Sequence, residues 1–163
     1  ILIVGYHGMA DKIDGAMAHS FSSATYQWMK INGREVGELG IDAAVAGKMG
    51  VAPIFCASDD KGVAEARDFF GDIETVVTKQ AMGWNAAVSK HPKRSIEEIY
   101  QRAKRAAGHV DDAKPFTFED PLTFEIRYKR IERAELASRG YKAGERVDPY
   151  TVRFQLDTIT DYY

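Results

Sequence analysis

The sequence has a single cysteine, Cys56, so no disulfide can form within the chain. A protein without disulfides suits a reducing compartment, and we expect a cytoplasmic protein in which the Cys56 thiol is buried and structural. An excess of positive charge is also missing, because 22 lysines and arginines are balanced by 24 aspartates and glutamates. This balance, without any basic block, argues against nucleic acid or an anionic membrane as a partner.

Long apolar runs are absent too. No stretch approaches the roughly 20 residues that cross a bilayer, and the first apolar run, residues 1–4, is too short for a signal peptide. What the chain does have is 163 residues of which 45% are hydrophobic, enough for the core of one domain. Because it begins with Ile inside a predicted strand, we expect residues 1–163 to be a single α/β domain that forms the carboxyl-terminal part of a longer chain.

Strand and helix patterns alternate along the chain, which predicts an α/β fold with a mixed β-sheet and helices on both faces. The β-branched run at 1–6 is typical of a strand buried on both sides. Asn32-Gly33 predicts a hairpin over 24–39. Further strands are expected at 51–57, 73–78, 122–128 and 150–157, and helices at 40–49, from Ser58 or Asp59 to about 70, and near 130–139.

The segment from 79 to 110 contains two sequence signals that bear on where a helix begins. Pro92 argues against regular structure, so we expect a loop around it. Ser95 followed by Glu98 matches a capping box and predicts that a helix begins there.

Three residues stand where catalytic or metal-binding groups are often found. His7 directly follows the first strand, Glu38 lies in a turn flanked by Gly37 and Gly40, and His19 ends a loop rich in Gly, Ala and Met. Each also has an ordinary interpretation. His7 can be a structural or surface histidine at a strand end, and Glu38 a solvated carboxylate in a turn. His19 can be a helix-capping or partly exposed histidine.

Two neighbouring acids, Asp59 and Asp60, offer further oxygen ligands, although Ser-Asp-Asp before a helix is typical of N-capping, which we favour. His91 and His109 have the surroundings of surface residues and are left out of the site. One histidine and one glutamate are too few for catalytic zinc, which uses about three protein ligands. A complete site therefore needs one of these acids or residues from an upstream segment.

Several motifs resemble the zinc-dependent D-aminopeptidase family of the DppA type. They are "GYHGMA", "AHS" and "INGREVGELGIDAAVAGKMGVAPIFCASDD", which follow one another between residue 1 and about residue 92. The resemblance implies an α/β metallopeptidase with two zinc ions per subunit and a closed ring of ten subunits. It places metal ligands at His7 and Glu38 and the catalytic histidine at His19. The family's other ligands, an Asp-x-Glu pair and another histidine, lie upstream of the matched region.

The resulting hypothesis is an aminopeptidase that releases N-terminal, D-configured residues from short peptides with zinc-activated water. We expect a homo-oligomer without nucleic-acid or membrane partners. Two alternatives remain open from the sequence: a non-catalytic α/β binding or assembly subunit, and a hydrolase of a non-peptide amide on the same scaffold.

Overall fold

The computed structural model describes residues 1–140 and 142–162, which form two β-sheets and four α-helices. The mixed sheet contains β1 (Leu2–Tyr6), β4 (Phe55–Asp59), β5 (Glu74–Gly83) and β6 (Ala86–Ser89), in that order. The antiparallel sheet has the order β3 (Arg34–Glu35), β2 (Tyr26–Ile31), β7 (Leu122–Tyr128), β9 (Thr151–Leu156) and β8 (Glu145–Arg146). The helices are α1 (Glu38–Lys48), α2 (Asp60–Phe70), α3 (Pro92–Ala107) and α4 (Ile131–Ser138), with short 3-10 turns at Val110–Asp112 and Ile159–Tyr162.

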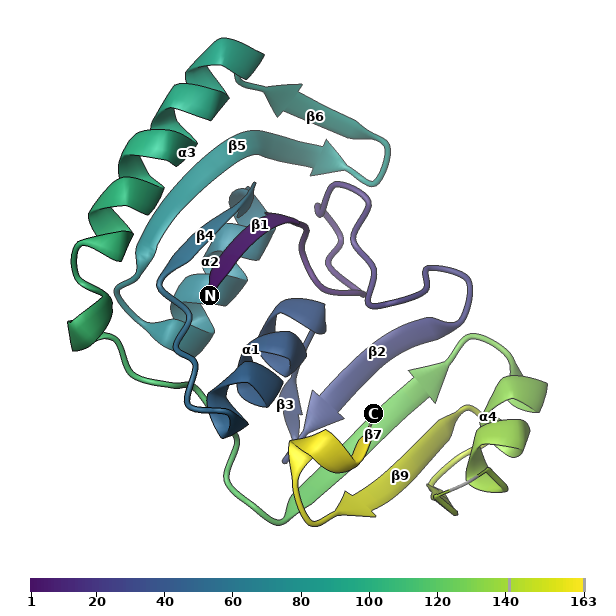
Figure 1. Cartoon of the computed structure of the whole chain (residues 1–163). Coiled ribbons are helices and arrows are strands. Elements are labelled where there is room, and N and C mark those ends of the chain that lie inside the picture. The colour runs from purple at the N-terminus through teal and green to yellow at the C-terminus, as the bar shows by residue number, and fades with distance from the viewer. Residues whose placement is uncertain (141, 163) are drawn as a thin grey trace.

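The mixed sheet carries helices on both faces, as predicted (Figure 1). β1, β4 and β5 are parallel, and β6 returns antiparallel to β5. Successive residues of β4 alternate between the faces: Phe55 and Ala57 pack with Ala106 of α3, whereas Cys56 packs with Ala66 of α2. Cys56 is buried, as predicted, and this burial raises the pKa of its thiol to about 12.

Helix α1 lies between the two sheets and contributes to both cores (Figure 1). Its Leu39 and Ala43 pack with the mixed sheet, whereas Ile41 and Ala44 join the larger core of the antiparallel sheet. In that larger core the alternate residues of β7, among them Phe124, are fully or almost fully buried. The second sheet was not predicted as a separate unit, although its strands at 122–128 and 150–157 and its Asn32-Gly33 hairpin were found correctly.

Strand β1 differs from the prediction, because it is an edge strand of the mixed sheet and is not buried on both faces. Ile3 is buried at 4% exposure, but Leu2 and Val4 on the opposite face are each 52% exposed. Helix α3 covers that face at β4 and β5 and does not extend its packing to β1. An apolar run of sequence indicates a strand, but it does not show whether other elements cover both faces of that strand.

The region from 79 to 95 also departs from the prediction. β5 continues to Gly83 and forms a hairpin with β6 in place of a loop. Pro92 is the first residue of α3, and the His91 side chain accepts a hydrogen bond from the backbone of Lys93. Proline fits the first turn of a helix, where its missing N–H leaves no bond unmade. Ser95 therefore lies inside the helix and is not its N-cap.

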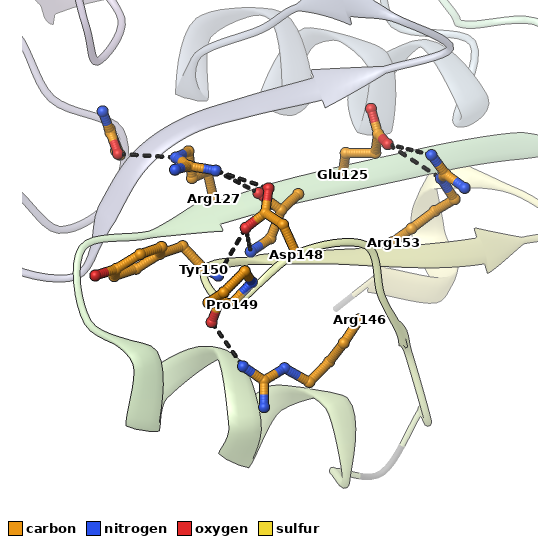
Figure 2. A network of polar contacts seen from close by, with 9 residues as sticks. Glu125, Arg127, Arg146, Asp148, Pro149, Tyr150 and Arg153 are labelled. Atoms are coloured by element: carbon orange, nitrogen blue, oxygen red, sulfur yellow. Dashed lines mark hydrogen bonds and ion pairs between the residues drawn. The ribbon is translucent and has the colours of Figure 1, made fainter.

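A network of charged side chains covers the face of the antiparallel sheet opposite α1 (Figure 2). The Arg127 guanidinium pairs with the Asp148 carboxylate at 2.9 Å, and Arg153 pairs with Glu125 at 2.9 Å. Backbone N–H groups, first that of Tyr150, donate to Asp148 and hold the pKa of its carboxyl below the usual range. This face is therefore organised by ion pairs around a tight turn.

Within the described part of the chain, no helix combines the length and the apolar character that crossing a membrane requires.

Candidate metal centre

His7 is the first residue after β1, at the carboxyl edge of the mixed sheet. The neighbouring parallel strand β4 ends at the same edge and leads directly into α2. The first turn of α2 presses against the backbone of His7, since a Cβ on Gly62 would lie 3.2 Å from the His7 carbonyl carbon and 2.2 Å from Ser58 Oγ. Only glycine permits this approach, and the contact fixes the position from which His7 projects.

Glu38 opens α1, one residue after the N-cap Gly37. The sequence placed Glu38 in a turn, but the helix begins two residues earlier than predicted. The first turn of a helix favours a negative side chain, because the unpaired backbone N–H groups give that end a partial positive charge. The Glu38 carboxylate also accepts a hydrogen bond from the backbone N–H of Phe21, which ties it to the loop that carries His19.

His19 lies in the long loop between β1 and β2. The turn of the β5–β6 hairpin forms hydrogen bonds with this part of the loop. The backbone N–H of Met17 donates to the Trp84 carbonyl at 2.8 Å, and Trp84 Nε1 donates to the Ala18 carbonyl at 3.1 Å. Met17 and Phe21 on either side of His19 adopt positive φ values of 53° and 57°. The hairpin thus constrains a backbone that the loop sequence alone does not favour.

The structure brings His7, His19 and Glu38 together. One potential ligand atom from each lies within 4.8 Å of the others. The two imidazole rings stack, with centroids 3.8 Å apart and planes inclined by 19°. All three side chains are half-buried.

Hydrogen bonds define the tautomer of both rings. His7 Nδ1 lies 3.1 Å from the Gly8 carbonyl oxygen, and His19 Nδ1 lies 2.6 Å from the Met17 carbonyl oxygen. A carbonyl oxygen only accepts, so each Nδ1 carries a proton, and in the neutral ring the lone pair is then on Nε2. Metal-binding histidines commonly donate their second nitrogen to a carbonyl in this manner. Two imidazole nitrogens and one carboxylate form a donor set that fits zinc.

The other acidic and histidine candidates lie outside this group. Asp59 is the N-cap of α2 and accepts the Gly62 N–H at 2.7 Å, which confirms the capping interpretation. Asp60 accepts the Ala81 N–H at 2.8 Å and pairs with a lysine. His91 caps α3, and His109 is 72% exposed beside an aspartate. These contacts account for Asp60, His91 and His109, whereas the second carboxylate oxygen of Asp59, Oδ2, is buried without a hydrogen-bond partner among the described residues.

A pocket of about 450 Å³ opens beside the two histidines. One wall consists of the end of β1 with His7, and the loop residues up to His19 form another. The third wall belongs to the β5–β6 hairpin, which contributes Lys79, Trp84 and Asn85. Sequence reasoning missed these hairpin residues, although "GWN" between two alternating runs is a turn signal that could have indicated the hairpin.

A buried acid, Glu65 of α2, lies behind the centre. It is 7% exposed and accepts the N–H of Met9 at 3.1 Å, while its other oxygen lies next to Gly37. It thus contacts both the segment after His7 and the segment before Glu38. Burial raises the pKa of the Glu65 carboxyl to about 7. No local motif marks this residue, because its role depends on contacts distant in sequence.

Comparison with known proteins tests the resemblance suggested by the sequence motifs. A family model described as D-aminopeptidase matches residues 1–163, the whole of this chain. The chain belongs to the D-aminopeptidase family. A relative, the D-aminopeptidase of Bacillus subtilis, is 29% identical over 162 residues, which cover 99% of this chain.

The solved structure of a family member has the same fold. The Zn-dependent D-aminopeptidase DppA from Bacillus subtilis, described as a self-compartmentalizing protease, superposes with a TM-score of 0.87. The match covers 95% of this chain at 29% identity. This chain spans 58% of the curated relative and 56% of the solved one, somewhat more than half of their length.

Proposed function

We propose that this protein is a zinc-dependent aminopeptidase that releases N-terminal, D-configured amino acids from short peptides. The convergence of His7, His19 and Glu38, with both Nε2 lone pairs available, is the observation that carries this proposal. Membership of the D-aminopeptidase family supports it, as does the zinc dependence of the solved relative.

In this proposal His7 Nε2 and the Glu38 carboxylate are two of the zinc ligands, and the upstream segment that the family resemblance implies supplies the others. Zinc at such a site supplies Lewis-acid chemistry, which makes water a stronger nucleophile and polarises a peptide carbonyl. His19 acts as the acid and base: its Nε2 accepts a proton from the attacking water and returns it to the departing amine. The hydrogen bond from His19 Nδ1 to the Met17 carbonyl keeps Nε2 directed at the reaction.

We extend the proposal to the family's two zinc ions per subunit, to a cytoplasmic location and to assembly of this chain into a closed homo-oligomeric ring. The description of the solved relative as self-compartmentalizing supports such an assembly. The balanced charge of the chain fits a partner that is another copy of itself better than a polyanion.

The decisive experiment compares metal content with turnover in the full-length protein. Elemental analysis gives zinc per chain, and release of D-alanine from D-alanylglycine is measured beside release of L-alanine from its L-counterpart. We expect His19→Ala to lose turnover by 100-fold or more with zinc retained, whereas His7→Ala and Glu38→Ala lose zinc as well. His109→Ala, an exposed histidine away from the centre, serves as the matched control.

Other outcomes would redirect the proposal. If His19→Ala loses zinc together with His7→Ala, then His19 is a third ligand and another group transfers the proton. A metal-free protein with full activity would contradict the proposal altogether. A zinc protein without peptide turnover would favour the binding-subunit or non-peptide amide alternatives.

A further inference from the structure

The pocket beside the histidines has an unusual charge balance. Its described lining residues include one permanently charged side chain, Lys79, and none that is acidic. Apart from the two candidate histidines, the rest of the lining is uncharged: it consists of small residues, aromatic residues such as Trp84, the amide Asn85 and the thioether Met17. None of these lining side chains gives an ammonium group a counter-charge, whereas Lys79 gives one to an anion.

Lys79 is also distinctive among the lysines. It is half-buried on β5, and no carboxylate lies within 4.0 Å of it in residues 1–140 and 142–162. The other half-buried lysines have partners: Lys61, Lys90 and Lys142 pair with acidic side chains, and Lys30 lies 4.7 Å from the centroid of a tryptophan ring. A partly desolvated ammonium without a partner is unfavourable, so its charge is available for a bound anion.

We infer that Lys79 binds the free carboxylate of a short peptide whose amide bond lies at His7, His19 and Glu38. This inference rests on the proposed function and specifies its substrate class. The pocket lies directly beside the two histidines, and a volume of about 450 Å³ accommodates a dipeptide or tripeptide. With its carboxylate at Lys79, the peptide directs its amino end toward the three candidate residues.

The expected specificity follows from this orientation. Dipeptides and tripeptides with a free carboxylate are substrates, and longer chains lose the contact with Lys79 because their carboxylate lies beyond the pocket. A carboxyl-terminal amide of the same size loses the ionic contact while keeping its shape. Comparing a peptide acid with its amide therefore measures the contribution of the carboxylate charge to recognition.

The test measures hydrolysis of D-alanylglycine and D-alanylglycinamide by the zinc-loaded, full-length protein. We expect the wild type to favour the free acid by tenfold to 100-fold in kcat/KM, mainly through KM, as for a charge-assisted hydrogen bond. Lys79→Met keeps the aliphatic stem and should lose this factor for the acid alone. Lys104→Met, on the exposed side of α3, is the matched control and should change neither rate.

Equal hydrolysis of acid and amide by the wild type would overturn the inference and leave the proposed function standing. An equal loss for both probes in Lys79→Met would overturn it as well, because that pattern indicates a structural role. If the wild type hydrolyses neither probe, the proposed function fails. Titration calorimetry with the same two peptides then decides: binding that requires both the carboxylate and Lys79 supports the inference, and equal binding contradicts it.

Discussion

The antiparallel sheet and the mixed sheet differ in what their side chains do. The antiparallel sheet buries residues such as Phe124 on one face and ties down the other with ion pairs such as Arg127–Asp148. The mixed sheet has four strands in place of five, and polar residues gather along one edge of it, with His7 after β1 and Lys79 of β5 paired with the last residue of β4. Stability and the candidate chemistry therefore reside in different parts of one chain, so substitutions should separate them.

The largest expected effect on stability comes from the antiparallel sheet. Phe124 is fully buried, and Phe124→Ala should lower the free energy of unfolding by about 3–5 kcal/mol, because it removes apolar contacts and leaves a cavity. Urea denaturation measures this loss, and kcat of the folded fraction should stay unchanged. Thr123→Ala, on the opposite face of the same strand, is the control, with a loss of less than about 1 kcal/mol. Similar losses for both would contradict the division between the sheets.

Next in size is the effect of pH through Glu65. Its carboxyl has a pKa of about 7 in the folded protein and an ordinary value of 4.5, so the folded state keeps a proton that the unfolded state has released. Stability is therefore highest below about pH 4.5 for this group and falls as the pH rises through 7. At about 1.4 kcal/mol per pKa unit, the loss is about 3 kcal/mol between pH 4 and pH 8.

Glu65→Gln tests this directly, because glutamine still accepts the Met9 N–H but does not ionise. The difference in unfolding free energy between the variant and the wild type should grow by about 3 kcal/mol from pH 4 to pH 8. The exposed Glu97→Gln should keep the wild-type slope. Parallel stability curves for wild type and Glu65→Gln would show that the buried carboxyl does not hold a proton.

The smallest effect concerns the two tryptophans, Trp84 in the turn between β5 and β6 and Trp28 in β2. Trp84→Phe keeps an aromatic ring but removes the Nε1 donor to the Ala18 carbonyl, which loosens the backbone next to His19. A lost hydrogen bond of about 1 kcal/mol predicts a fall in kcat of about threefold to tenfold with zinc content unchanged. Trp28→Phe in β2 should leave kcat as it is. If both variants retain full activity, the hairpin does not position His19.

The candidate centre was partly predictable, because two of its members follow local rules. His7 after an apolar strand and Glu38 in a glycine-flanked turn are visible in a short window of sequence. His19 was also a candidate from the sequence, but its catalytic role was assigned only through the family resemblance, since its loop has no periodicity of its own. The structure brings the three together, whereas their separate roles remain predictions.

Residues that act from a distance were missed for a physical reason. Lys79, Trp84 and Glu65 reach the centre through tertiary contacts, and their local sequences are typical of an ordinary strand, turn and helix. At α3 two local signals competed, and Pro92 at the first helical position prevailed over the Ser95 capping box. The edge position of β1 depends on which strand lies beside it, and the residues of β1 do not encode that choice.

The pairing of β2 with β7 has a consequence for how this chain folds. Met29 pairs with Ile126, and the chain between these strands contains α1, β4, α2, β5, β6 and α3. Closing so long a loop early carries a large entropic penalty, so compaction of the intervening segment should precede it. Because α1 then joins both cores, the two sheets are expected to unfold in one cooperative transition despite their separate hydrogen-bond networks.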